Sequence, residues 1–178
     1  MNYLTRIHGI EGDDYQVHQK LKSIFDQDNI LFQRGRFETV VLSAKEPAVK
    51  YPSTVTTPIL DFLGSIDCGA ELLFTARLNP VTTRWIDGKN RRCPVEQSRL
   101  RKWINGKLEN AGVAAEFIYD AEGARISQKK GHKITLSSVY VTGMCQVKDI
   151  NLFRGALIKG IGHSKGLGFG LLNIFANL

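Results

Sequence analysis

The alternation of hydrophobic and polar positions predicts a strand followed by a helix at the start of the chain. Tyr3 to Ile10 alternates as a half-buried strand does. Asp13, with Gln16 three positions later, forms a capping-box pattern that marks the start of a helix. Apolar residues then recur at the spacing of one helix face: Val17, Leu21, Ile24 and Phe25. This stripe predicts a helix with one side in a hydrophobic core.

Strand patterns dominate the rest of the first half. Two short runs, Ile30 to Phe37 and Glu38 to Leu42, have the composition of paired strands around a glycine turn. Three prolines predict a loop or an irregular edge over residues 44–57. Glu71 to Leu78 is a further strand, ended by an Asn-Pro pair. The order of elements up to this point is therefore β-α-β-β-β.

The second half opens with a basic stretch, Arg84 to Arg92, which we interpret as a link between two halves. The pattern then predicts a helix from Pro94 to Asn110, strands over Ala114 to Tyr119 and Ile134 to Val147, a helix from Asp149 to Lys159, and a strand from Leu171 to Phe175. We therefore predict an α+β fold of tandem ferredoxin-like (RRM-like) domains, residues 1–80 and 81–178. Each is a four-stranded antiparallel sheet with helices on one face, and the cleft between them is a basic groove.

The charge balance favours a polyanionic partner. Lys and Arg number 24 against 17 Asp and Glu, for a net charge of +7 over 178 residues. The amino terminus lacks the apolar run of a signal peptide, and no stretch is long enough to span a bilayer. Three scattered cysteines argue against disulfides and a zinc site. We expect a cytoplasmic protein that needs no membrane, metal or cofactor.

A glycine-rich segment, Gly160 to Gly170, holds five of the seventeen glycines. Such backbone lets a ligand approach the N–H groups closely, and Lys165 within it favours an anion such as phosphate. The segment does not match a P-loop, because Lys165 precedes Gly166 instead of following the last glycine. It does not match a dinucleotide fingerprint either, because no acidic residue follows it. A simple turn before the last strand is an equally good interpretation.

On the first helix, Tyr15, His18 and Lys22 fall along one edge of the apolar stripe. At this boundary between core and solvent, a phenol, an imidazole and an ammonium group can meet a ligand together. Imidazole suits acid–base chemistry because it ordinarily titrates near neutral pH. The alternative interpretation is a boundary aromatic beside a surface histidine.

Four motifs, in order along the chain, resemble those of a known family. They are Tyr15-Gln16-Val17-His18 with Leu21, Phe74 to Pro80, Lys102-Trp103-Ile104 with Leu108, and Gly160 to Leu172. Together they are similar to the CasE family, the repeat-processing endoribonuclease of the CRISPR subtype I-E Cascade, within the RAMP superfamily. The chain departs from the family pattern at Thr75, where some members have arginine, at Ser23, where some have lysine, and at His163, where proline is common.

The resemblance implies a metal-independent endoribonuclease that binds the stem-loop of a CRISPR repeat. It would cleave at the 3′ base of the stem by attack of a 2′-hydroxyl, giving a 2′,3′-cyclic phosphate and a 5′-hydroxyl. His18 and Tyr15 would be catalytic. The product crRNA would stay bound, and the protein would be a subunit of Cascade beside other subunits, including the adjacent backbone subunit.

RNA binding would fall to basic side chains and to the glycine-rich segment. The candidates are Lys22, Arg77, Arg91, Arg92, Arg125, Lys129, Lys130, Lys133, Gly162, Ser164, Lys165 and Gly166. Arg125 to Lys133 would form a thin basic hairpin that enters the groove near the end of the stem. Two alternatives remain: a non-catalytic RAMP-type subunit that only holds crRNA, and a basic RNA-binding α+β protein unrelated to CRISPR.

Overall fold

The computed structural model describes residues 2–49, 51, 54–129 and 132–175. The first sheet contains four antiparallel strands in the order β2-β3-β1-β4. Its elements are β1 (Tyr3–His8), α1 (Asp14–Phe25), β2 (Leu31–Arg34), β3 (Glu38–Ser43) and β4 (Thr54–Pro58). The predicted stripe of α1 is buried against Ile7 and Phe32 of the sheet, so the pattern of apolar positions predicted this face correctly.

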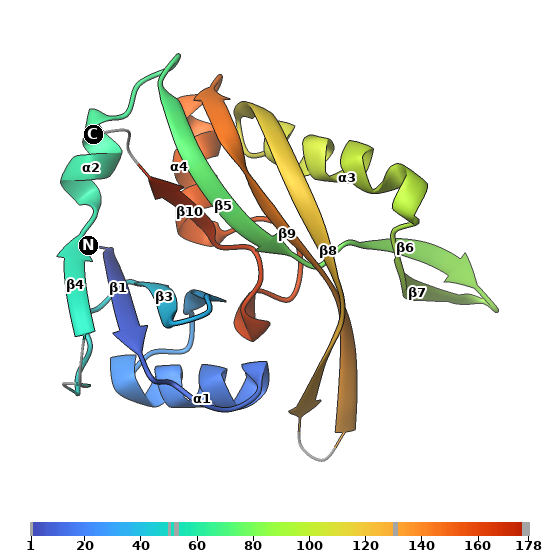
Figure 1. The fold of residues 1–178 in the computed structure, drawn as a ribbon, viewed down its shortest axis with the longest axis horizontal. Helices are drawn as coiled ribbons and strands as arrows, with labels where there is room; N and C mark the ends of the chain where they lie inside the picture. Colours follow the sequence, from blue (N-terminus) through green and yellow to red (C-terminus); the bar gives the residue numbers. More distant parts are fainter. Residues whose placement is uncertain (1, 50, 52–53, 130–131, 176–178) are drawn as a thin grey trace.

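The second sheet has the order β10-β5-β9-β8 and is also antiparallel. Its strands are β5 (Glu71–Leu78), β8 (Val113–Lys129), β9 (His132–Val147) and β10 (Leu172–Phe175), with helices α2 (Leu60–Ser65), α3 (Gln97–Glu109) and α4 (Ile150–Lys159). Core residues of α3 and α4, such as Ile104 and Phe153, share one cluster with Phe74 of β5. The two sheets confirm a tandem ferredoxin-like fold (Figure 1).

The boundary between the two sheets differs from our prediction. We expected a division at residue 80, but β5 pairs with β9 and β10, so residues 71–78 belong to the second sheet. The sheets divide between β4 and β5 instead. Which sheet a strand joins depends on partners far along the chain, and the local pattern does not reveal them. The 44–57 segment, predicted as irregular, supplies the edge strand β4 at its end.

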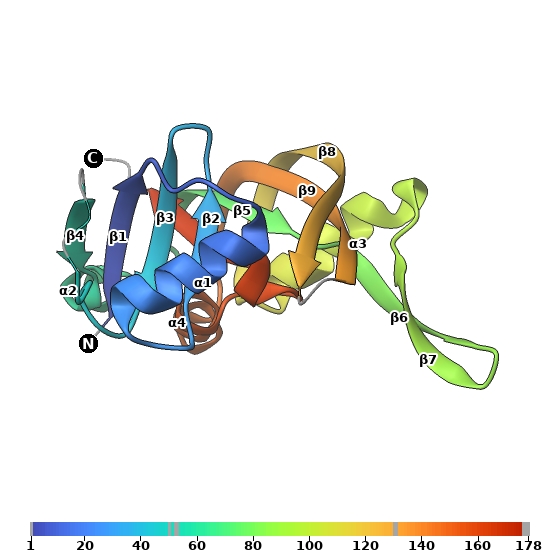
Figure 2. The same ribbon diagram turned by 90° about the horizontal axis from the view of Figure 1, so that it is seen from below.

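The basic stretch Arg84–Arg92 is not a link between halves. It forms most of an antiparallel hairpin, β6 (Val81–Ile86) and β7 (Lys89–Pro94), inserted between β5 and α3. Figure 2 shows this hairpin projecting away from the rest of the protein.

Strand β8 is much longer than the predicted Ala114–Tyr119, while β9 begins two residues before the predicted Ile134. Both continue beyond the second sheet, and their ends pair over part of the predicted Arg125–Lys133 hairpin. A register shift between Ala121 and Gly123 interrupts their pairing, which then resumes to Lys129 and His132. Bulges of this kind bend a strand pair and increase its twist. The outer part of the pair, residues 123–129 and 132–138, lies beside α1 (Figure 1) and is called the β8–β9 arm below. None of the helices in the described ranges is long and apolar enough to cross a membrane.

Candidate active site

Helix α1 begins at a capping box, as the sequence predicts. The Asp13 side chain accepts hydrogen bonds from the backbone N–H groups of Tyr15 and Gln16, and the Gln16 side chain accepts one from the Asp13 N–H. This reciprocal pair satisfies donors that a helix start otherwise leaves open. With Val17 and Leu21 buried, the wheel leaves Tyr15, His18 and Lys22 half-buried at the edge of the core.

The β8–β9 arm holds the start of α1 from outside. Ser127 Oγ accepts a hydrogen bond from the Tyr15 N–H at 3.0 Å and lies 3.1 Å from Asp13 Oδ1. The backbone N–H of Gln128 donates to Asp13 Oδ2 at 3.1 Å. Burial opposes ionisation of Asp13, but the backbone and Ser127 hydrogen bonds outweigh it and hold the pKa of this carboxyl below its ordinary value.

The next residue, Asp14, ties the arm to α1 by charge. Arg125 donates to both of its oxygens, at 2.9 and 2.7 Å, and Arg34 approaches one of them at 3.5 Å. The Asp14 side chain is only 4% exposed. A two-pronged guanidinium–carboxylate pair of this kind fixes orientation as well as distance. Tyr15 and His18 are therefore carried on a helix whose first turn is fastened to the second sheet.

The His18 ring lies between β2 and the glycine-rich segment. It stacks on Phe32, with ring centroids 6.1 Å apart and planes 18° from parallel. A Cβ placed on Gly166 would stand 3.5 Å from Cε1 and Nε2 of His18. The backbone of the segment therefore passes directly over the imidazole, although 148 positions separate the two residues in the sequence.

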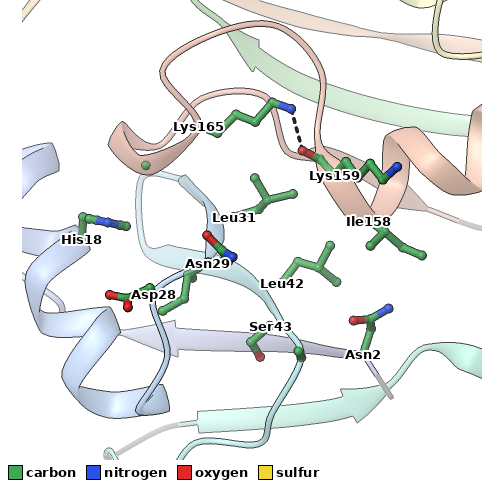
Figure 3. Close-up of a pocket in the computed structure, with 13 residues that line it drawn as sticks. Asn2, His18, Asp28, Asn29, Leu31, Leu42, Ser43, Ile158, Lys159 and Lys165 are labelled. Atoms are coloured by element: carbon green, nitrogen blue, oxygen red, sulfur yellow. Dashed lines mark hydrogen bonds between the residues drawn. The ribbon is translucent and has the colours of Figure 1, made fainter.

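A pocket of about 610 Å³ opens beside His18. Figure 3 shows His18 and Lys165 entering it from different elements, with Lys159 nearby. Lys165 Nζ donates to the backbone oxygen of Lys159 at 2.7 Å. Burial, and then the Lys159 charge, lower the pKa of Lys165. The pocket thus joins an imidazole to two lysines, a set suited to an anion that exchanges protons.

The glycine-rich segment is held in one shape by the end of β5. Asn79 Nδ2 donates to Ser164 Oγ at 2.8 Å, and the Gly170 N–H donates to the Arg77 backbone oxygen at 2.7 Å. Ser164 has a φ of 61°, a left-handed backbone conformation that residues other than glycine rarely adopt. A short 3₁₀ turn, η1 (Lys165–Leu167), follows and places Lys165 and Gly166 beside α1. Gly162, also left-handed, is half-buried before this turn.

Three predicted RNA-binding cations are paired with carboxylates of the protein. Arg77 is 8% exposed and donates from Nε and Nη2 to the Glu122 carboxylate, both at 2.8 Å. Arg125 is held by Asp14, as described above. Lys22 pairs with Asp28. The hydrogen bond from Lys22 lowers the pKa of Asp28, and the charges of Lys22 and His18 lower it further, while burial opposes the shift. These cations help to shape the site through their ion pairs with Glu122, Asp14 and Asp28, and their contact with RNA stays a prediction.

Three further predicted cations, Arg91, Arg92 and Lys133, lie on the surface. The Arg91 guanidinium lies 3.5 Å from the Asp87 carboxylate. No ion pair or hydrogen bond joins the side chain of Arg92 or Lys133 to another described residue. Lys130 lies outside the described residues, and of Lys129 only the backbone is described. Tyr15 does not line the pocket of His18. Among the residues described, no three His, Cys, Asp or Glu side chains gather as a metal site.

Sequence reasoning missed several residues of this site. Lys159 and Asp28 line the pocket, and Asp14 and Glu122 neutralise the predicted cations. No local pattern singles out these positions, because each acquires its role from a partner far along the chain. His163 had no assigned role: burial, followed by the charges of Arg92, Lys107 and Lys165, lowers its pKa.

Comparison with known proteins identifies relatives of this chain and structures with the same fold. The Cascade subunit CasE of Escherichia coli is 26% identical over 184 residues, which cover 91% of this chain and 92% of that protein. The solved Cas6e of Escherichia coli has a TM-score of 0.74 at 23% identity, over 98% of both chains. Cse3 of Thermus thermophilus, solved with an RNA representing a pre-cleavage complex, has a TM-score of 0.75 at 19% identity, over 98% of this chain and 99% of that one.

A family model described as "CRISPR associated protein" matches residues 5–175. This match spans both sheets, the helix that carries His18 and the glycine-rich segment. The chain therefore belongs to the CRISPR-associated protein family.

Proposed function

We propose that this protein is the endoribonuclease that processes CRISPR precursor RNA and then remains on the crRNA as a subunit of Cascade. One observation carries the proposal: His18 lies against Gly166 of the glycine-rich segment, at a pocket that Lys159 and Lys165 also line. The names of the similar proteins, a Cascade subunit and a CRISPR endoribonuclease, Cse3, bound to RNA, support it.

The proposed reaction is transesterification within the RNA. A 2′-hydroxyl attacks the adjacent phosphorus, the new P–O2′ bond forms, and the bond to the 5′-oxygen breaks. One proton leaves the 2′-hydroxyl and one is delivered to the departing 5′-oxygen, so the products are a 2′,3′-cyclic phosphate and a 5′-hydroxyl. His18 transfers one of these protons. The reaction balances without a metal ion or a cofactor.

The other side chains would act on charge and position. The extra negative charge of the phosphorane would be steadied by the ammonium group of Lys165 and by Lys159 at the pocket wall. Tyr15, one turn before His18 on α1, would orient the reacting strand or donate to its phosphate. Because the β8–β9 arm fixes the first turn of α1, these groups are in place before RNA arrives.

The test is a single substitution at the imidazole. We expect His18→Ala to abolish cleavage of the cognate repeat stem-loop while its Kd stays within a few-fold of the wild-type value. Cleavage is followed on labelled RNA with the end groups identified, and binding on RNA with a 2′-deoxy sugar before the break. The wild-type protein should leave that deoxy RNA uncut and should cut ordinary RNA in excess EDTA. Unchanged cleavage by His18→Ala would refute the proposed site.

A further inference from the structure

The β6–β7 hairpin is a basic arm with one aromatic side chain near its tip. Its two-residue turn, Asp87-Gly88, has both φ angles positive, at 50° and 72°, which matches the twist of the flanking strands. The hairpin projects from the protein and is attached only at its base (Figure 2). Two strands alone cannot bury a large side chain on both faces, so side chains on this arm face solvent or a partner.

The strand register assigns the side chains to two faces. Residues opposite each other in an antiparallel pair point to the same side, and neighbours along a strand alternate. One face carries Arg84 opposite Arg91, and Ile86 opposite Lys89. The other face carries Thr83 opposite Arg92, and Trp85 opposite Asn90.

The first face is largely neutralised by the protein itself. Arg84 donates to Glu96, which precedes α3, at 2.8 Å, and Arg91 lies 3.5 Å from Asp87. The hydrogen bond from Arg84 holds the pKa of Glu96 below its ordinary value. Thr82 and Arg84 also line a hollow shared with α3. This face is directed at the protein's own helix.

The second face is open. Trp85 is 71% exposed, one of the most exposed large hydrophobic side chains among the described residues. Arg92 is exposed as well, and no ion pair or hydrogen bond joins its side chain to another described residue. In this register, Trp85 and Arg92 are diagonal neighbours on adjacent strands, where Cα atoms are typically about 7 Å apart. An aromatic ring and an unpaired guanidinium therefore lie side by side in solvent.

The base of this face adjoins the glycine-rich segment. Arg92, Lys107 and Lys165 all act on His163, so cations from β7, α3 and the segment converge there. Lys107 Nζ stands 5.4 Å above the Trp103 ring, which keeps that side chain along α3. Lys165 in turn lines the pocket of His18. Cations of the hairpin, of α3 and of the glycine-rich segment therefore act on one residue, His163, in the segment that also lines the proposed site of cleavage.

We propose that the Trp85–Arg92 face binds unpaired nucleotides that adjoin the cleaved phosphodiester, an inference that rests on the proposed function. A base would stack on Trp85, and the backbone would pass Arg92 toward His163 and Lys165. Bases inside a stem have both faces covered, so a solvent-exposed indole can stack only on an unpaired base. The ligand of this face is thus single-stranded RNA, while the stem is bound elsewhere.

The test compares two RNAs and four variants. Both RNAs are the repeat stem-loop with a 2′-deoxy sugar before the break. One keeps its unpaired flanks, and the other, called flankless below, keeps only the single nucleotide after the break. We expect Trp85→Ala to weaken binding of the flanked RNA about tenfold and Trp85→Phe to stay within about threefold, because a smaller ring still stacks. Arg92→Ala should weaken binding of the flanked RNA. It should also reduce the slope of log Kd against log salt concentration by about the amount expected for one phosphate contact.

Lys89→Ala is the matched control, because it removes one exposed cation from the opposite face of the same hairpin. We expect it to bind both RNAs as the wild type does, and all four variants to bind the flankless RNA equally well. Equal losses on the two RNAs, or no loss for Trp85→Ala, would overturn the inference. Loss of binding to another protein subunit with RNA affinity intact would also overturn it, in favour of a protein partner. Cleavage of the flankless RNA made with ribose throughout, measured at saturating protein and lost in His18→Ala alone, reports separately on the proposed function.

Discussion

The two basic hairpins of this protein use their charges in opposite ways. On the β8–β9 arm, the Arg125 guanidinium is bound to Asp14 and the arm's polar groups hold the start of α1. On the β6–β7 hairpin, one face is neutralised by Glu96 and Asp87 while Trp85 and Arg92 face solvent. Both look alike in the sequence, as short runs rich in Arg and Lys. A basic run therefore indicates a nucleic-acid surface only where no carboxylate of the fold reaches it.

The largest effect should come from breaking the contact between the arm and α1. Arg125→Ala would leave the buried Asp14 carboxylate with only Arg34, 3.5 Å away. We expect this variant to lose about 3 kcal/mol in the free energy of unfolding, because an uncompensated buried charge is costly. Urea unfolding followed by circular dichroism measures the loss. A stable Arg125→Ala protein with weakened RNA binding would show instead that Arg125 contacts RNA, as the sequence suggested.

Glu122, at the bulge just before the β8–β9 arm, offers a pH-dependent test. Burial opposes ionisation of Glu122, but hydrogen bonds from Arg77 and Ser138 and the Arg77 charge hold its pKa below the ordinary value. Because the folded pKa is depressed, the stabilisation is present above the ordinary glutamate pKa and is lost as pH falls through the folded pKa. We expect Glu122→Gln to cost about 1.5 kcal/mol at pH 7.

That cost should shrink as the pH falls below the ordinary glutamate pKa, because protonation progressively removes the wild-type carboxylate. Unfolding midpoints in urea at pH 7, 4 and 3 follow the change. A difference between the two proteins that stayed constant over this range would contradict the assignment of Arg77 to Glu122.

The smallest effect is expected at the outer end of the arm, where the comparison between the hairpins breaks down. Lys133 on β9 is exposed and has no partner among the described residues, like Arg92 on the other hairpin. Lys133→Ala should change the free energy of unfolding by less than about 0.5 kcal/mol. It should lower the salt dependence of stem-loop binding by about one phosphate contact. Kd values measured from 50 to 200 mM salt would reveal it, and an unchanged slope would place the stem elsewhere.

Much of the local structure could be predicted because its causes are local. The capping box of Asp13 and Gln16 spans three positions, and the stripe from Val17 to Phe25 follows from the period of a helix. The strands on either side of Gly35 and the Asp149 cap of α4 were also predicted correctly. The four motifs that resemble the CasE family were sufficient to predict the fold and the family, which the comparisons confirm.

The features that the sequence did not reveal are those in which a strand or a charge has a distant partner. The strand Glu71–Leu78 was predicted correctly, but its place beside β9 and β10 was not. Arg77 was a candidate for RNA, yet Glu122, 45 positions away, takes its guanidinium. Local pattern cannot reveal which carboxylate will meet which guanidinium in the folded chain.

By itself, the sequence determined the helices, most of the strands, the glycine-rich segment, and the phenol, imidazole and ammonium groups along one edge of the first helix. These features depend on periodicity, capping and the freedom of glycine, all of which act within a few residues. Only the tertiary structure decided that His18 meets Gly166, that Arg125 and Arg77 are held by Asp14 and Glu122, and that Trp85 and Arg92 share an open face. Burial and pairing decide whether a charge stabilises the protein or remains available to a ligand, and both are properties of the folded chain.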